Sequence, residues 1–311
     1  MILALFDPPS DFARRIREVV PDEQVVLTEP GDDAYDDALR KADVIVGRPV
    51  VEDLDRAGAL SWLQLSSAGA DAYVDVLRDE VVLTAANGVY GVPTSEHAVA
   101  MMLAMVRGIP DAVRAAGEKR WQRPLQYDEL YGRTCGILGL GDIGSSIARR
   151  ADAFGMRVVA LRRRPGNPPD YVDAVYGPDG LYELLQESDH VVNVLPATEA
   201  THHLIDAAAL AGMKPSAYFY NVGRGTTVDE GALVDALKEG RLAGAGLDVF
   251  EEEPLPPESP LWDLPNVVLT PHRGGSSPRE EERVADLFLQ NLERRANGED
   301  LLNVVDRGLG Y

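Results

Sequence analysis

A glycine-rich hexapeptide near the middle of the 311-residue chain constrains its fold more than any other feature. The hexapeptide follows the apolar run 134–138 and precedes a helical pattern that begins near Ile143. A strand that turns on glycines into a helix presents bare backbone N–H groups at the positive end of that helix, a geometry that accepts a pyrophosphate. A glycine pattern alone is weak, but this position between strand and helix predicts a dinucleotide-binding turn. The turn consists of Gly139, Leu140, Gly141, Asp142, Ile143 and Gly144.

Strand-like apolar runs alternate with helical stretches through almost the whole chain, a pattern typical of parallel α/β folds. The candidate strands of the first third are 2–6, 24–28, 44–48, 63–67 and 81–85. A second series consists of 134–140, 156–162, 190–195, 217–222, 244–250 and 267–271. Two such series predict two α/β domains, each built on a doubly wound parallel sheet.

Two long helices are expected beside these strands. The stretch 94–107 is rich in alanine and methionine, follows Pro93, and offers Thr94 or Ser95 as a cap. Its nearly all-apolar surface predicts burial between domains or between subunits. The stretch 276–297 carries acidic residues in its first turn, as the helix dipole favours.

Composition limits the partners and the compartment. The formal net charge of −21 argues against nucleic acid or an anionic membrane as a partner. No apolar run approaches the roughly twenty residues that span a bilayer, and the start of the chain lacks a signal-peptide pattern. The single cysteine, Cys135, lies in a predicted strand, which favours a buried thiol and a reducing cytoplasm. Salt adaptation and a GC-rich genome both remain open as origins of the acidic surface.

Three polar residues lie just after successive strands of the second series. Arg224 is held among glycines after 217–222, Glu253 follows 244–250, and His272 follows 267–271. Any one of them could be an ordinary surface residue. Because the carboxyl ends of parallel strands meet at one edge of a sheet, their joint placement predicts a shared site.

These three groups suit the reduction of a 2-oxo acid. Hydride transfer to a ketone carbon leaves an alkoxide, which a histidine can protonate near neutral pH. A carboxylate orients the imidazolium and favours its charged form, and a guanidinium pairs bidentately with a substrate carboxylate. Arg224, Glu253 and His272 supply these roles. No pair of histidines has metal-ligand spacing beside other ligands, so we expect no metal.

Six segments, in order, resemble those of D-isomer-specific 2-hydroxyacid dehydrogenases almost from end to end. The segments are 87–98, 136–144, 195–201, 221–225, 246–254 and 270–277. The resemblance implies Arg224, Glu253 and His272 as the catalytic set, and Asp248 facing the nicotinamide carboxamide. The further residues that it implies for the cofactor cleft are Leu195, Pro196, Thr201 and Val222.

The resemblance also implies a domain plan and a substrate loop. Residues 1–92 and 276–311 would form a flavodoxin-like substrate domain, and 93–275 a Rossmann-type dinucleotide-binding domain. Backbone N–H groups of Ala68 and Gly69 would hold the substrate carboxylate together with Arg224. A homodimer would form through the region 93–121.

One departure from the family pattern concerns the cofactor. Family members that use NAD carry an acidic residue after the second strand of the dinucleotide domain, where this chain has Arg162, followed by Arg163 and Arg164. Guanidinium groups bind a 2′-phosphate that a carboxylate would repel, so NADP is expected over NAD, with NAD possible. A basic loop facing water is the bland alternative.

The leading hypothesis is an NADPH-preferring reductase of the glyoxylate and hydroxypyruvate kind. Formate dehydrogenase is disfavoured because that subgroup has an amide where this chain has Glu253. Phosphoglycerate-type and phosphite-type dehydrogenases remain alternatives. A non-catalytic, dinucleotide-sensing protein like the corepressors of this fold is the competing class.

Overall fold

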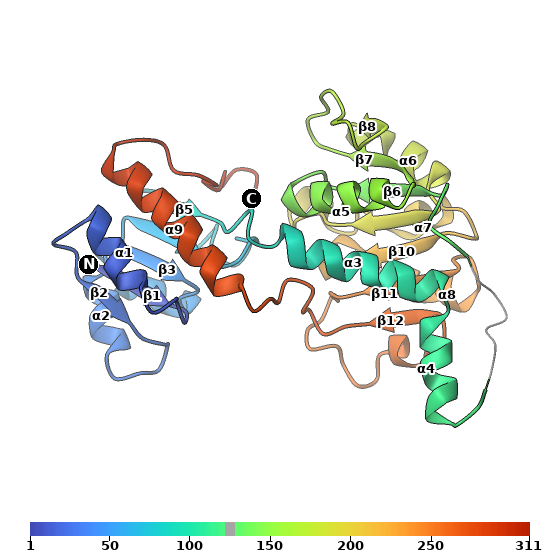
Figure 1. Cartoon of the computed structure of the whole chain (residues 1–311), viewed down its shortest axis with the longest axis horizontal. Helices are drawn as coiled ribbons and strands as arrows, with labels where there is room; N and C mark the ends of the chain where they lie inside the picture. Colours follow the sequence, from blue (N-terminus) through green and yellow to red (C-terminus); the bar gives the residue numbers. More distant parts are fainter. Residues whose placement is uncertain (122–127) are drawn as a thin grey trace. The chain divides into compact units, whose positions relative to one another are not determined.

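A computed structural model of the chain describes residues 1–121 and 128–311, which form two α/β units (Figure 1). Unit 1 consists of residues 1–90 and 277–311, and unit 2 of residues 91–276. The chain therefore passes between the units at 90/91 and again at 276/277, where the sequence predicted 92/93 and 275/276.

Unit 1 is built on a five-stranded parallel sheet with the order β2-β1-β3-β4-β5. This is the flavodoxin-like order, which confirms the fold expected for the substrate domain. The strands are β1 (Ile2–Leu5), β2 (Val25–Leu27), β3 (Val44–Gly47), β4 (Trp62–Leu65) and β5 (Val82–Thr84). The helices are α1 (Phe12–Val19), α2 (Tyr35–Lys41), the 3₁₀ turn η1 (Val51–Arg56) and α9 (Glu280–Ala296).

The C-terminal helix α9 completes the core of unit 1 beside α1 (Figure 1). Phe288 of α9 stacks on Trp62 of β4 with ring centroids 5.1 Å apart, and it also contacts Phe12 of α1. All three aromatic side chains are buried. This packing explains why the last 35 residues fold with the first 90 although the whole of unit 2 separates them in sequence.

Unit 2 contains a seven-stranded, all-parallel sheet with the order β12-β11-β10-β9-β6-β7-β8. The order reverses between β6 and β9, which makes their carboxyl ends the place where a Rossmann sheet binds its ligand and confirms the Rossmann-type prediction. The strands are β6 (Thr134–Leu138), β7 (Arg157–Leu161), β8 (Ala174–Tyr176), β9 (His190–Asn193), β10 (Tyr218–Asn221), β11 (Gly244–Leu247) and β12 (Val267–Leu269).

Two separate buried clusters mark the two faces of this sheet. The helices on one face are α3 (Gly91–Val106), which leads into α4 (Ile109–Gly117), and α5 (Asp142–Ala153); those on the other are α6 (Leu181–Glu187), α7 (Ala207–Ala211) and α8 (Glu230–Lys238). Short 3₁₀ turns are η2 (Pro178–Gly180), η3 (Glu199–Thr201), η4 (Gly225–Thr227) and η5 (Pro260–Asp263). None of the described helices is long and apolar enough to cross a membrane.

Two elements differ from the sequence prediction. Helix α3 begins at Gly91, so Thr94 and Ser95 lie buried inside it and do not cap it. Pro93 sits in the first turn, where its missing N–H costs no hydrogen bond. Strand β8 was not predicted, because three half-buried residues beside a proline-rich loop carry too little pattern to be recognised.

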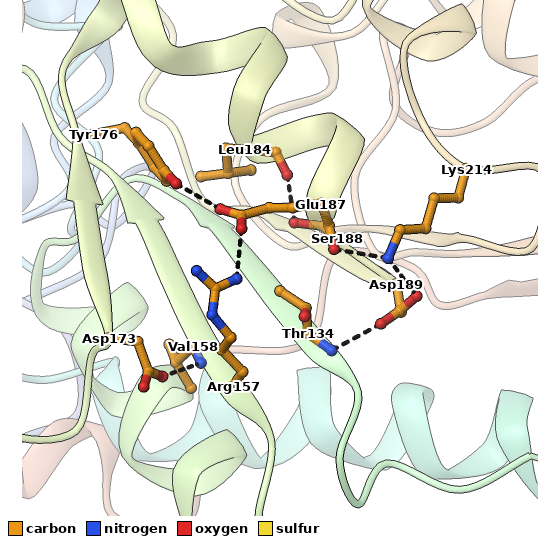
Figure 2. Close-up of polar contacts among 10 residues, drawn as sticks. All are labelled: Thr134, Arg157, Val158, Asp173, Tyr176, Leu184, Glu187, Ser188, Asp189 and Lys214. Atoms are coloured by element: carbon orange, nitrogen blue, oxygen red, sulfur yellow. Dashed lines mark hydrogen bonds and ion pairs between the residues drawn. The ribbon is translucent and has the colours of Figure 1, made fainter.

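Polar contacts tie together the amino ends of strands β6, β7 and β9 (Figure 2). The Asp189 carboxylate accepts the backbone N–H of Thr134 at 2.9 Å and the Lys214 ammonium at 2.8 Å. The Glu187 carboxylate pairs with the Arg157 guanidinium. These contacts fix the end of the sheet that lies away from the glycine turn.

The next residue, His190, makes the stability of unit 2 dependent on pH. Its side chain is 1% exposed, and burial lowers its pKa to about 4 from an ordinary value of 6.5. Because the unfolded chain takes up this proton at a higher pH than the folded chain does, stability should fall as the pH falls from 6.5 to 4, by about 3 kcal/mol.

We expect His190→Gln to remove this component, which denaturant melts at pH 7 and pH 4.5 will measure. The matched control is His202→Gln, since His202 is exposed. If His190→Gln loses as much stability on acidification as the wild type does, the folded chain protonates His190 without penalty and this prediction is wrong.

Candidate active site

The glycine turn between β6 and α5 has the geometry that the sequence predicted. Gly139 adopts φ +102°, a left-handed conformation that a side chain would strain. A Cβ on Gly144 would lie 1.9 Å from the carbonyl oxygen of Gly139, so only glycine lets α5 pack this closely against the turn. A Cβ on Gly141 would meet nothing within 4 Å, which leaves the backbone open to a ligand at the start of α5. These residues fit a bound pyrophosphate.

The loop after β9 lies directly beside this turn. A Cβ on Gly139 would meet the carbonyl oxygen of Val194 at 3.2 Å, so the two backbones are close. The Thr201 hydroxyl donates to the Pro196 carbonyl at 2.6 Å and, with Thr198, closes a capping box. Leu195 lies in the same loop, just before Pro196, at the carboxyl edge of the sheet.

The arginine run follows β7 at the same edge. The backbone N–H of Arg162 donates to the carbonyl of Tyr176 at 2.9 Å, which pairs the end of β7 with β8. The side chains of Arg162, Arg163 and Arg164 are exposed. Since β7 neighbours β6, this basic segment lies at the strand next to the glycine turn.

Arg224 leaves the end of β10 from a backbone that buried polar side chains hold. Its carbonyl accepts hydrogen bonds from Asn221 Nδ2 at 3.0 Å and from Thr227 Oγ1 at 2.6 Å. The Asn193 amide of β9 donates to both of these side chains, at 3.0 and 2.7 Å. Asn193, Asn221 and Thr227 are at most 2% exposed. The network orients the half-buried Arg224, and Val222, at 6% exposed, packs beneath the same loop.

The loop after β10 also packs tightly against the segment that follows β11. A Cβ on Gly225 would lie 1.8 Å from the carbonyl oxygen of Phe250, so only glycine permits this approach. Glu253 stands three residues beyond Phe250 and accepts its backbone N–H at 3.0 Å through Oε1. Arg224 and Glu253 are therefore carried by two segments in direct contact.

The side chains of His272 and Glu253 are in direct contact. His272 Nδ1 lies 2.7 Å from Glu253 Oε2. The imidazole is half exposed, at 51%, so Nε2 is accessible for a proton transfer. The His272 backbone has φ +46°, an uncommon conformation for a residue with a side chain that marks an imposed geometry.

Asp248 holds the segment that carries His272. Its side chain is 3% exposed and accepts the Thr270 hydroxyl at 2.6 Å and the N–H groups of Arg273 and Gly274 at 3.0 and 2.8 Å. Burial alone would raise the pKa of Asp248, but hydrogen bonds, including one from His97, outweigh it and bring the pKa to about 2. The carboxylate thus faces the protein, and its contact with the nicotinamide carboxamide remains a prediction.

The substrate loop expected around Ala68 and Gly69 lies in unit 1, at the carboxyl end of β4. The loop is braced by Ser67, whose hydroxyl donates to the Gly69 carbonyl at 2.8 Å and whose carbonyl accepts the N–H of Ala86. The N–H groups of Ala68 and Gly69 have no acceptor among the described residues. They therefore remain available to bind an anion.

Sequence reasoning missed the residues that support the catalytic groups. Asn193 and Thr227 lie within or just after apolar stretches that are typical of an ordinary core, and Thr270 begins the segment 270–277, in which only His272 has a predicted role. A polar side chain at the last position of a buried strand, such as Asn193, is the signal that could have identified them. Cys135 is fully buried, and burial raises its thiol pKa to about 12, as expected of a core thiol. No cluster of three metal-binding side chains occurs among the residues described.

Comparison with known proteins agrees with this geometry. Residues 99–274, more than half of the chain, match the family model for the NAD binding domain of D-isomer specific 2-hydroxyacid dehydrogenases. The glyoxylate/hydroxypyruvate reductase B of Pectobacterium carotovorum is 38% identical over 281 residues, 86% of this chain and 87% of that enzyme. The chain belongs to the D-isomer specific 2-hydroxyacid dehydrogenase family. It is a 2-hydroxyacid oxidoreductase with a dinucleotide-binding domain, which confirms the family and the enzyme class that the sequence predicted.

Two further relatives extend the comparison. The glyoxylate reductase of Korarchaeum cryptofilum is 42% identical over 236 residues, which cover 73% of this chain and 70% of that enzyme. The NADPH-dependent glyoxylate/hydroxypyruvate reductase from Sinorhizobium meliloti, solved in complex with NADP and sulfate, superposes with a TM-score of 0.85 at 28% identity, covering 100% of this chain and 99% of that one. The non-catalytic alternative is not favoured by these relatives.

Proposed function

We propose that this dehydrogenase reduces small 2-oxo acids, of the size of glyoxylate and hydroxypyruvate, to 2-hydroxy acids, with the D configuration wherever C2 is a stereocentre, and that it uses NADPH in preference to NADH. The observation that carries the proposal is the His272–Glu253 pair at 2.7 Å, on the same sheet edge as the glycine turn. The similarity to glyoxylate and hydroxypyruvate reductases supports the substrate class.

The side chains divide the work of the reduction. When bound, the reduced nicotinamide supplies a hydride to the carbonyl carbon. His272 donates the proton that the carbonyl oxygen requires, from Nε2, because Nδ1 faces Glu253. Glu253 holds the imidazole in orientation through its contact with Nδ1. The Arg224 guanidinium binds the substrate carboxylate and polarises the adjacent carbonyl.

The backbone N–H groups of Ala68 and Gly69 are our second proposed anchor for the substrate carboxylate. The loop that carries them is fixed by Ser67, and the N–H groups of Ala68 and Gly69 have no acceptor in the part of the chain that the structure describes, which supports this role. Glyoxylate and hydroxypyruvate carry nothing larger than a hydroxymethyl group on the carbonyl carbon, so these contacts and Arg224 would supply most of the specific binding.

Arg162 is the residue that we propose to select NADPH. Replacing it by aspartate removes a cation beside the 2′-phosphate and adds an anion, and hydrogen bonds to charged groups contribute about 1.5–3 kcal/mol. We therefore expect Arg162→Asp to lower kcat/KM for NADPH roughly tenfold to a hundredfold and to leave kcat/KM for NADH unchanged or higher.

The control for this change is Arg17→Asp, which alters the net charge equally at an exposed arginine of α1. The kcat/KM values for NADPH and for NADH should both be unchanged in Arg17→Asp. Undiminished use of NADPH by Arg162→Asp would mean that the arginine run only faces water.

We also propose a homodimer through α4 and the residues near Trp121. The large apolar residues Ile109, Val113 and Trp121 are 49%, 65% and 97% exposed, which suits a subunit contact. Light scattering should find two chains per particle, and Val113→Glu should give single chains. A monomeric wild-type protein would contradict this assembly.

We also propose that the enzyme is cytoplasmic. Its single cysteine, Cys135, is buried, which agrees with a reducing compartment.

The function is tested by steady-state kinetics with a panel of 2-oxo acids and each cofactor. We expect the highest kcat/KM with NADPH and glyoxylate or hydroxypyruvate. Binding of NADPH without turnover of any 2-oxo acid would favour a dinucleotide-sensing protein and refute the proposal.

A further inference from the structure

A second cluster of polar side chains lies in unit 2, where α3 meets the segment that carries His272. His97 projects from the second turn of α3, and its side chain is 22% exposed. Its Nε2 atom lies 2.9 Å from Thr270 Oγ1 and 3.4 Å from Asp248 Oδ1. Neither the substrate chemistry nor the cofactor turn uses this histidine.

The direction of these hydrogen bonds follows from the charge of Asp248. An ionised carboxylate only accepts, so the Thr270 hydroxyl must donate its proton to Asp248 Oδ1 at 2.6 Å. The Thr270 oxygen then accepts from His97, which therefore carries a proton on Nε2. A chain of donors runs from His97 through Thr270 to Asp248.

Asp248 in turn holds the backbone of His272 and of the two residues after it. Its carboxylate accepts the N–H groups of Arg273 and Gly274, and its backbone carbonyl accepts that of His272 at 2.8 Å. Three consecutive N–H groups thus point to one buried residue, and they hold His272 at its left-handed φ of +46°. Such a conformation persists only when its surroundings over-determine it.

The His97 ring also packs against the same segment. A Cβ on Gly274 would lie 3.1 Å from His97 Cδ2 and 2.8 Å from Asp248 Oδ2, so the segment closely approaches both side chains. Helix α3 starts at Gly91, the first residue of unit 2, and Gly274 lies just before the crossing at 276/277. The cluster therefore joins the two segments by which the chain enters and leaves unit 2.

We propose that His97 is a positioning residue for His272: its hydrogen bond to Thr270 fixes the Asp248 carboxylate, which holds the backbone of the two residues directly after His272 and so keeps His272 in place for proton donation. The inference rests on the proposed role of His272 as the proton donor. His97 itself does not touch the substrate. Its loss should therefore slow the chemical step more than it weakens binding.

The experiment compares His97→Leu, which removes the donor at similar volume, with His97→Gln, whose amide keeps an N–H donor. We expect His97→Leu to lower kcat about tenfold, with the KM of the 2-oxo acid and the Kd of NADPH within twofold of wild type, and His97→Gln to recover most of the rate. The primary isotope effect on kcat, measured with NADPH that carries two deuterium atoms at C4 of the nicotinamide, should rise in His97→Leu, because a misplaced donor makes the chemical step slower.

A second measurement needs no turnover. In hydrogen-exchange mass spectrometry of the protein without ligands, peptides that span residues 270–275 should exchange faster in His97→Leu and in Thr270→Val than in wild type. Faster exchange that is confined to these peptides supports the proposal, even in a variant whose activity is too low to measure. The double variant His97→Leu/Thr270→Val should have a kcat no lower than that of the less active single variant, since both substitutions remove the same chain of hydrogen bonds.

The results separate the inference from the function on which it rests. An inactive wild-type enzyme would refute the proposed function. An active wild type with an unchanged kcat and unchanged exchange in His97→Leu would refute the positioning role alone. A lower kcat in His97→Leu that His97→Gln does not restore would also refute it, because the N–H donor of residue 97 would then not be what positions His272.

Discussion

Replacing His272 by glutamine should lower kcat by roughly a hundredfold to ten-thousandfold, the contribution that a positioned general acid typically makes. Glutamine keeps a similar size and can still accept a hydrogen bond from a substrate, but it has no proton to give near neutral pH. The residual rate should come from water as the proton source. Steady-state kinetics with hydroxypyruvate and saturating NADPH measure this loss.

The Kd of NADPH should stay within about twofold in the same variant, because His272 lies after β12 and the glycine turn after β6. His202→Gln serves as the control for proton donation, since it makes the same change at an exposed histidine that is not the partner of Glu253. An unchanged kcat in His272→Gln would mean that another group donates the proton, and the assignment of the His272–Glu253 pair would fail.

Replacing Arg224 by glutamine should reduce kcat/KM for glyoxylate by at least about thirtyfold. Truncating one member of a desolvated, hydrogen-bonded charge pair costs about 2–5 kcal/mol, which corresponds to roughly thirtyfold to several thousandfold. Lysine keeps the charge but not the planar fork that a carboxylate accepts bidentately. We therefore expect the order wild type, Arg224→Lys, Arg224→Gln in kcat/KM.

Two observations would separate this effect from misfolding. Melting temperatures should change little, because the buried network of Asn193, Asn221 and Thr227 holds the Arg224 backbone and not its guanidinium. Arg241→Gln, at a half-buried arginine that pairs with Glu239 away from the carboxyl ends of the strands, should retain full activity. Equal kcat/KM values for Arg224→Gln and wild type would show that the substrate carboxylate binds elsewhere.

The sequence predicted those parts of the fold that depend on strong local patterns. Apolar runs bounded by turns identified every strand except β8, whose three half-buried residues have no such pattern. The sequence predicts a start of α3 at residue 94, directly after Pro93, but the helix begins three residues earlier, at Gly91. A first helical turn tolerates proline, so Pro93 does not mark the start. Short edge strands and helix starts depend on tertiary contacts that periodicity does not contain.

The candidate site divides in the same way. Strand ends and glycines predicted where Arg224, Glu253 and His272 would lie, and the structure brings Glu253 and His272 into contact. The residues that orient them could not be derived, because hydrogen bonds such as Thr270 to Asp248 join segments far apart in the sequence. The left-handed backbone of His272 was equally hidden, since such a conformation is imposed by its neighbours and not by local preference.

The most direct test of the central claim follows one hydrogen atom. Hydroxypyruvate should be reduced by the wild-type enzyme with NADPH that carries two deuterium atoms at C4 of the nicotinamide, and the product analysed by mass spectrometry and chiral chromatography. We predict D-glycerate with deuterium at C2, formed far more slowly by His272→Gln. L-glycerate, a product without deuterium at C2, or no product at all would contradict the account.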